Sequence, residues 1–519
     1  MLASAFAKAG VGCLKSQTAL TPRALWSKAI KPTSNAFSTF ARARLPSSTF
    51  TDAWRAPPKH PHQSRGYSVI STSTPVTKHL RSLEPRFFSS NGAQSAAAMA
   101  SGASAASLPQ PLPVLSPPSV GRWLLFSGAL VFAVIVVGGV TRLTESGLSI
   151  TEWRPIAGIL PPLSHEAWNE EFDKYKATPE FKLLNHSITL DEFKNIFYME
   201  WGHRVLGRLI GITFVVPFAY FALRKKLTAS LPAKLMGMTL LIGVQGIIGW
   251  YMVKSGLEDS IYEERGVPRV SQYRLALHLG TAFVLYAGMM WAGFAALSDW
   301  RYAHGGLWSK VTDGRTPGVV ASHRLFKRFS KFSWALTALV FLTALSGAFV
   351  AGLDAGLLYN EFPYMGGRLA PPADELMDRA YAKSPDGSDL WWRNIFENPT
   401  TTQFNHRLLG ITTYVGSGAL FATTLLPAYR NVLPPLTTRF AAMAFGMANV
   451  QVLLGISTLL YLVPVSLAAC HQAGSVALLT LMVHLLMTMR RPGQAAKAWR
   501  QAWSQATKKS AKAKKTKSH

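Results

Sequence analysis

Cysteine and charge are both scarce in this chain of 519 residues. It contains only two cysteines, Cys13 and Cys470, and 15% of its residues are charged, whereas 49% are apolar. Cys13 lies in a leader that we expect to be removed, so no internal disulfide is available to the mature chain. A long chain that is rich in apolar residues and poor in charge is typical of an integral membrane protein.

Acidic residues are nearly absent from residues 1–118, a leader that holds only Asp52 and Glu84 among many Ser, Ala, Arg and Lys. This composition predicts a mitochondrial transit peptide, with a disordered basic tail as the alternative. The net charge of +28 does not indicate nucleic-acid binding. The basic residues lie in the leader, in particular loops and in a C-terminal tail at 490–519, where they serve targeting and topology.

Eight apolar stretches are long enough to cross a hydrocarbon core of ~30 Å, which needs about 20 helical residues. They lie at 121–141, 204–223, 234–253, 273–297, 330–352, 406–426, 438–461 and 467–488. We therefore expect an all-α integral membrane protein with eight transmembrane helices, arranged as two pseudo-symmetric four-helix bundles. An even number of spans places both ends of the mature chain on one side.

The loops differ in charge. Basic clusters occur in the loops at 224–233 and 298–329 and in the tail, so these parts are expected to face the mitochondrial matrix. The opposite loops, richer in acids, are 142–203, 254–272 and 353–405. They are expected to face the intermembrane space. The tail from residue 508 onward is expected to be disordered and to contact inner-membrane lipid.

Two segments repeat almost the same pattern. One reads Glu200-Trp-Gly-His203-Arg204-Val-Leu-Gly and the other Gln403-Phe-Asn-His406-Arg407-Leu-Leu-Gly. Each opens an apolar stretch, and a second histidine follows two stretches later in each half, at His278 and His471. The repeat predicts an N-terminal half at 119–300 and a C-terminal half at 330–489, joined by a matrix linker at 301–329.

Each half thus offers two histidines from different helices at a similar depth. Two such imidazoles can hold one haem iron from both faces, and ionisable side chains in membrane spans are usually functional. A single histidine at a helix end is more often an interfacial residue, and zinc or copper also accepts imidazole. A zinc or copper cage, however, usually recruits further Cys, Asp or Glu ligands at short spacing, and these are lacking around His278 and His471.

Arginines and glycines accompany the histidines. Arg204 and Arg407 are suited to bind haem propionates at the membrane edge, although a snorkelling interfacial arginine is the alternative. Glycines at helical spacing would let a flat macrocycle or a neighbouring helix approach closely. They are Gly207, Gly211, Gly243, Gly246 and Gly249.

The two copies differ at one chemically important position, where Glu200 aligns with Gln403. A carboxylate three residues before a ligand histidine can touch the haem edge or relay protons, whereas an amide cannot titrate. The N-terminal half is therefore the candidate for chemistry and the C-terminal half for a permanent cofactor. The alternative for Glu200 is an interfacial acid in water or in an ion pair.

The first of two segments runs from Gly138 to Pro162 and includes Thr141-Arg142-Leu-Thr-Glu-Ser-Gly-Leu-Ser149 and Trp153-Arg154-Pro155, and the second is Glu200-Trp-Gly-His203-Arg204. The two segments together resemble mitochondrial haem A synthases. The resemblance covers about 120–488. Some bacterial relatives carry a cysteine pair in the first loop, and this chain has none between 142 and 203. A thiol-based step is therefore in doubt here.

The resemblance implies an oxidoreductase that converts haem O to haem A, by oxidising a ring methyl to a formyl group, for cytochrome c oxidase. It implies haem b on His406 and His471, the substrate haem on His203 and His278, and a catalytic role for Glu200. Two rival functions stay open: a di-haem membrane cytochrome b that only transfers electrons, and a non-catalytic haem carrier for oxidase assembly.

The resemblance also implies partners. Ferredoxin and its reductase are the expected electron donors, and haem O synthase and oxidase assembly factors are expected neighbours in the mitochondrial inner membrane. The haem sites are expected towards the intermembrane space, and no nucleic acid is expected. The source of the inserted oxygen and the oligomeric state, a homo-oligomer included, stay open.

Overall fold

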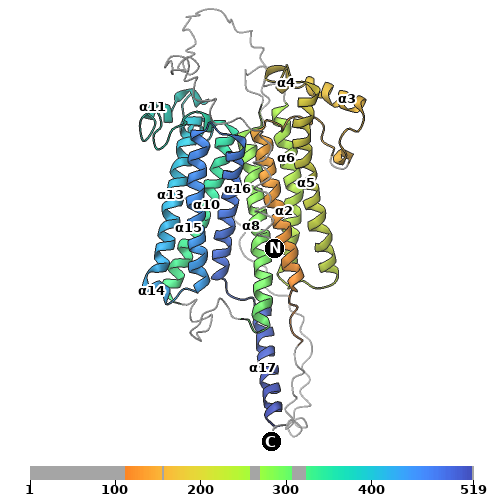
Figure 1. The fold of residues 1–519 in the computed structure, drawn as a ribbon, viewed down its shortest axis with the longest axis vertical. Helices are drawn as coiled ribbons and strands as arrows, with labels where there is room; N and C mark the ends of the chain where they lie inside the picture. Colours follow the sequence, from red (N-terminus) through yellow and green to blue (C-terminus); the bar gives the residue numbers. More distant parts are fainter. Residues whose placement is uncertain (1–110, 155–156, 258–268, 307–322, 517–519) are drawn as a thin grey trace, which may run out of the picture. The chain divides into compact units, whose positions relative to one another are not determined.

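The computed structural model describes residues 111–516 except for 155–156, 258–268 and 307–322 (Figure 1). The predicted leader therefore lies outside the described residues, as does most of the predicted linker. Among the described residues the regular elements are helices, and eight of them are long and apolar enough to cross a membrane. This confirms the expected fold class, an all-α integral membrane protein.

The eight helices coincide with the predicted spans and extend beyond most of them. Their bounds are α2 (Pro118–Leu143), α5 (Leu190–Leu223), α6 (Leu231–Gly256), α8 (Gln272–Ala303), α10 (Arg324–Gly352), α13 (Pro399–Leu425), α15 (Pro435–Leu460) and α16 (Val465–Thr488).

The largest difference is the start of α5, which begins well before the predicted residue 204. Thr189 caps this helix: its side chain accepts a hydrogen bond from the backbone amide of Glu192, whose carboxylate accepts one from the Thr189 amide in return. Such a capping box satisfies otherwise unpaired amides, and its loss typically costs about 0.5–2 kcal/mol. His203 therefore lies well inside a helix rather than at its end.

The two halves repeat one set of helix contacts. In the N-terminal half α2 packs on α5 and α8, and α6 packs on α5 and α8. In the C-terminal half α10 packs on α13 and α16, and α15 packs on the same two helices. The halves meet through α2 and α8 on one side and α10 and α16 on the other.

The first long loop carries two short helices, α3 (His165–Lys176) and α4 (Pro179–Leu183). An aromatic cluster joins them to the start of α5. Its buried members are Trp168, Phe172, Tyr175, Phe193 and Phe197. Several of these rings meet edge to face at 5.0–6.5 Å between centroids, a favoured geometry for aromatic pairs. The loop is thus a packed layer on top of α5.

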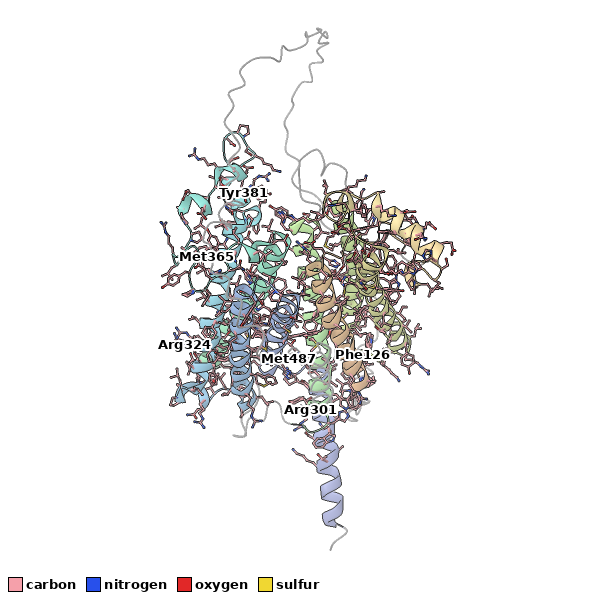
Figure 2. All side chains as sticks on the ribbon, turned by 45° about the horizontal axis from the view of Figure 1, so that its top comes forward. Phe126, Arg301, Arg324, Met365, Tyr381 and Met487 are labelled. Carbon is pink, nitrogen blue, oxygen red and sulfur yellow. The ribbon has the colours of Figure 1, made fainter. Side chains whose placement is uncertain are left out.

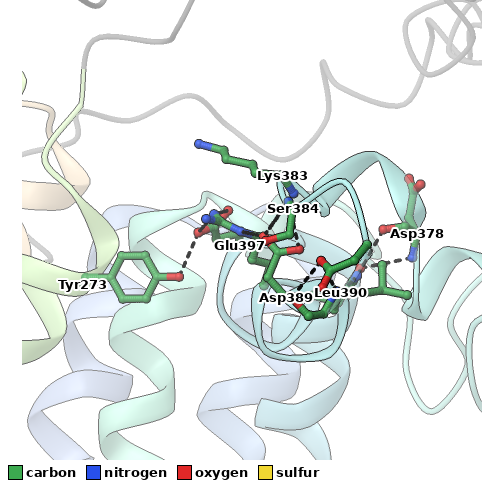
Figure 3. A network of polar contacts seen from close by, with 11 residues as sticks. Tyr273, Asp378, Lys383, Ser384, Asp389, Leu390 and Glu397 are labelled. Carbon is green, nitrogen blue, oxygen red and sulfur yellow. Dashed lines mark hydrogen bonds and ion pairs between the residues drawn. The ribbon is translucent and has the colours of Figure 1, made fainter. Parts of the chain in front are cut away.

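The second long loop is held by a polar network around α12 (Leu390–Glu397), drawn in Figure 3. Asp389 accepts hydrogen bonds from the Arg393 guanidinium and from the backbone amides of Lys383 and Ser384. Arg393 also pairs with Glu397 at 2.8 Å, and Glu397 accepts a hydrogen bond from the hydroxyl of Tyr273 on α8. The network therefore ties this loop to the N-terminal half.

The C-terminal tail is helical. It forms α17 (Gln494–Thr516), so the expectation of disorder from residue 508 onward is wrong. Arg490, just before α17, pairs with Asp299 on α8 at 2.8 Å, which directs the tail along the end of α8. Figure 1 places α17 and α14 (Pro427–Arg430) at the end opposite α3, α4 and α11 (Ala373–Leu376). Figure 2 shows Arg301 and Arg324 towards the end that bears α17, and Tyr381 towards the opposite end.

Candidate functional site

Two pairs of histidines face each other inside the two halves. His203 on α5 meets His278 on α8 with 6.5 Å between ring centroids, and His406 on α13 meets His471 on α16 at 6.4 Å. The rings of both pairs are steeply inclined to each other. The four histidines singled out from the sequence are thus brought together as predicted, one pair in each half.

The spacing within each pair suits one metal ion between the rings. A metal ion lies about 2 Å from each imidazole nitrogen that binds it, and each nitrogen lies one ring radius from its ring centroid. Two such bonds and two ring radii add up to roughly the observed separation of the centroids. The described residues contain no cluster of three or more His, Cys, Asp or Glu side chains able to hold a metal ion. A pair of imidazoles with no further ligand fits a haem iron, whose other four ligands come from the macrocycle.

A glycine on a neighbouring helix backs each imidazole. In the N-terminal half, a Cβ added at Gly138 would lie 2.7 Å from Cε1 of His203, and one added at Gly249 would lie 3.4 Å from Cε1 of His278. In the C-terminal half, a Cβ added at Gly347 would lie 3.3 Å from Cε1 of His406, and one added at Gly455 would lie 3.1 Å from Cε1 of His471. The contacts at Gly138, Gly347 and Gly455 leave little or no room for a side chain, whereas the contact at Gly249 is an ordinary van der Waals distance. In both halves, therefore, each imidazole lies against a glycine of a neighbouring helix.

Open space follows each first histidine along its helix. Gly207 and Gly410 lie four residues after His203 and His406, hence on the same face, and an added Cβ would meet no atom within 4 Å at either position. The predicted glycines Gly243 and Gly246 on α6 are equally open, whereas Gly249 packs on His278. A flat macrocycle held by the imidazoles requires such space beside them.

Three polar residues that the sequence reasoning missed support the histidines. Gln245 on α6 donates to the backbone carbonyl of His278 at 3.2 Å, and Gln451 on α15 donates to that of His471 at 3.0 Å. Ser346 lies 2.7 Å from Nδ1 of His406. An alignment of the two halves would have revealed the paired glutamines, because each lies four residues before the glycine that contacts the second histidine, Gly249 or Gly455.

Among the described residues, no side chain takes this role for the other three imidazoles. Nδ1 is buried without a hydrogen bond in His203, His278 and His471. A hydrogen bond to the nitrogen away from the metal orients a ligand histidine and raises its basicity. The Ser346 contact therefore distinguishes His406 and gives the C-terminal pair the more firmly oriented ligand.

Glu200 is buried, with 3% of its surface exposed, and donors contact both of its oxygens. Oε2 accepts hydrogen bonds from the Ser149 hydroxyl at 2.7 Å and from the Ile150 amide at 2.9 Å. Oε1 pairs with Arg204 at 2.6 Å. Arg204 in turn donates to the backbone carbonyls of Ile150 and Glu152. The two side chains thus clamp the first loop onto α5, and the ion pair named among the sequence alternatives is present.

The corresponding residues of the C-terminal half clamp the second loop without a carboxylate. Gln403 donates to the carbonyl of Tyr359 at 3.1 Å, and Arg407 donates to the carbonyls of Tyr359 and Tyr364. Both predicted arginines therefore bind loop backbone here. Nε of Arg407 is buried and has no hydrogen-bond partner among the residues that the structure describes.

A sequence model of the cytochrome oxidase assembly protein family COX15-CtaA matches residues 121–483, which include all four histidines. The chain belongs to this family. The match begins within α2 and ends within α16, so the COX15-CtaA region consists of the eight apolar helices and the loops between them.

Curated relatives agree with this assignment. The chain is 46% identical to Heme A synthase COX15 of Saccharomyces cerevisiae over 72% of its own length and 76% of that protein. It is 44% identical to Heme A synthase COX15 of Homo sapiens over 72% of this chain and 83% of the relative. It is also 49% identical to the Heme A synthase-mitochondrial ferredoxin fusion protein of Schizosaccharomyces pombe, over 58% of that protein's length.

Proposed function

We propose that this chain is a haem A synthase, an oxidoreductase that converts a ring methyl of haem O to the formyl group of haem A for cytochrome c oxidase. The observation that carries the proposal is the similarity to proteins named Heme A synthase, at 44–49% identity, across the eight apolar helices. The paired histidines in each half support it, because the substrate and a resident haem need separate sites.

We assign the two sites to the two halves. His406 and His471 would hold haem b in the C-terminal half (330–489), and His203 and His278 would hold haem O in the N-terminal half (119–300). The Ser346 contact to His406 supports a permanent cofactor there, since an oriented ligand binds more firmly. The carboxylate of Glu200 near His203, where the other half has the amide of Gln403, supports chemistry in the N-terminal half.

In this proposal the protein mainly binds and positions. Haem b, when bound, supplies one-electron redox chemistry. The backing glycines and the two glutamines hold the imidazoles in place. Glu200 and Arg204 fix the first loop against α5 on either side of His203, which would exclude water from the substrate site, and Arg407 would do the same for the second loop. Arg204 and Arg407 are also the groups that would bind haem propionates.

The chain is a multi-pass membrane protein, and we place it in the mitochondrial inner membrane, with both termini in the matrix. The basic residues at the end that bears α17 support this orientation, which puts the histidine pairs towards the intermembrane space. The ferredoxin fused to the Schizosaccharomyces pombe relative supports a ferredoxin as electron donor, and with it a ferredoxin reductase. Haem O synthase and oxidase assembly factors are proposed partners as well.

Haem extraction tests the function. The full chain, purified from mitochondria, should release haem B together with haem O or haem A when the extract is weighed by mass spectrometry. His406→Ala should lose haem B and keep the capacity for haem O, whereas His203→Ala should show the reverse. Haem B alone in the wild type would instead support a di-haem cytochrome. A protein that binds haem A but forms none from added haem O would support a carrier.

A further inference from the structure

A second buried carboxyl lies in the first loop, close to Glu200. Glu180 is the second residue of the short helix α4, and only 3% of its surface is exposed. It lies beside the aromatic cluster, where it interacts with Tyr175, a fully buried member of that cluster. Burying a carboxyl among apolar side chains costs free energy unless hydrogen bonds or charges compensate.

The compensation for Glu180 is incomplete. Its Oε2 atom is buried, and no donor in the described part of the chain forms a hydrogen bond with it. The charges that act on it are mostly of its own sign, from Glu200 and Glu145, and the opposing charge of Arg142 is already paired with Asp354 at 2.9 Å. Burial raises the pKa of Glu180 to about 8, and the charges of Glu200 and Glu145 act in the same direction. Tyr175 and Arg142 have smaller effects that lower this pKa.

Glu200 has the opposite surroundings. Both of its oxygens accept hydrogen bonds, from Ser149, Ile150 and Arg204. Glu200 therefore has a hydrogen-bond donor on each oxygen, whereas Glu180 is buried in surroundings that favour its neutral form. The loop thus places a carboxyl that favours its neutral form within range of the charge of Glu200.

We propose that Glu180 is a positioning residue that stores a proton for the Glu200 site. The inference rests on the proposed function. Oxidation of a methyl to a formyl group changes the number of protons at the site whichever oxygen source is used. In the proposed step the Glu180 carboxyl loses its proton, the Glu200 carboxylate gains it, and no electron moves. Glu180 then recovers a proton from the aqueous side of the loop.

Infrared spectroscopy of the purified full chain tests the proton-holding state without any turnover. In wild type, a protonated carboxyl band should persist at pH 7 and disappear as the pH rises through about 8. The band should be absent in Glu180→Gln and unchanged in the control Glu166→Gln, which alters an exposed acid of the same loop. A band of wild-type intensity in Glu180→Gln would overturn the proposal.

A second variant covers the case in which Glu180→Gln fails to accumulate. Tyr175→Phe removes the hydroxyl that favours the charged form of Glu180, so the band should titrate at a higher pH than in wild type. An unchanged titration would contradict the assignment of the band to Glu180.

The role in turnover has its own readout. Haem A formation by wild type should fall above pH 8, whereas Glu180→Gln should be about tenfold slower at pH 7 and show no such fall. Glu180→Asp should restore a pH-dependent profile. A wild-type rate and profile in Glu180→Gln would overturn the proton-storing role. If wild type itself formed no haem A, the proposed function would fail, while the infrared titration would still report on Glu180.

Discussion

Gly139 on α2 lies directly against the side chain of Gln472 on α16, so that the N-terminal and C-terminal halves touch at this point. A methyl group at Gly139 would overlap the carboxamide of Gln472, which donates a hydrogen bond to the Ile135 carbonyl at 3.2 Å. Gln472 follows the proposed ligand His471, and Gly139 follows Gly138, which backs His203. One contact between the halves is thus adjacent to both histidine pairs.

Replacing Gly139 by Ala should destabilise the protein, because Gln472 must leave its place between the helices. Moving the carboxamide breaks its hydrogen bond to the Ile135 carbonyl, and an unmet buried hydrogen bond costs about 1–3 kcal/mol, more than the helix propensity gained by Ala. In a Gln472→Ala background the same change should be neutral or stabilising. Unfolding in detergent of the two single variants and the double variant measures this coupling. An equal effect of Gly139→Ala in both backgrounds would contradict the contact.

Filling the open space beside His406 should expel the C-terminal haem. In Gly410→Leu the new side chain would occupy the space one turn beyond the histidine, and haem B recovered after extraction should fall at least about tenfold, which corresponds to ~1.4 kcal/mol. Gly237→Leu is the matched control, since Gly237 is equally open but exposed on α6. Full haem B content in both variants would refute the proposed site.

Glu200→Gln should let haem O or the hydroxylated intermediate accumulate and lower haem A by tenfold or more. The amide cannot accept from Ser149, Ile150 and Arg204 together, because one of its ends is a donor, and an unmet buried hydrogen bond costs about 1–3 kcal/mol. The control Glu192→Gln lies on the same helix and preserves the cap. Haem extraction measures both variants, and wild-type haem A levels in Glu200→Gln would end the proposal for this residue.

Asp389 should stabilise the second loop in a pH-dependent way. Although burial opposes it, the Arg393 guanidinium and the amides of Lys383 and Ser384 lower the pKa of Asp389 to about 2. A lowered pKa means that the stabilisation is complete above the unfolded value of about 4 and is lost as the pH falls towards 2. Asp389→Asn should therefore accelerate proteolytic cleavage of the loop at pH 7.

The same comparison at low pH completes this test. The difference between wild type and Asp389→Asn should shrink below pH 4, where an acid-tolerant protease can be used. Asp374→Asn changes an exposed acid of the same loop and should cleave at the wild-type rate throughout. A difference that stayed constant with pH would mean that the carboxylate charge does not matter.

Much of the architecture could be predicted from the sequence because it depends on local composition. The eight apolar stretches became eight helices, and the repeated segments around His203 and His406 led to both histidine pairs. The boundaries were less predictable. α5 begins early because of the Thr189 cap, and the polar, Lys-rich tail forms α17, although its composition suggested disorder.

The sequence by itself determined the membrane-spanning helices, their number and the duplicated histidines, since apolar length and repetition can be read along one dimension. Only the tertiary structure decided which polar groups meet. Ser149 and Ile150 reach Glu200 across some fifty residues of sequence, and the same folding of the loop leaves Glu180 buried without a hydrogen bond on Oε2. The different surroundings of the two acids depend on contacts distant in sequence, which residue spacing along the chain does not encode.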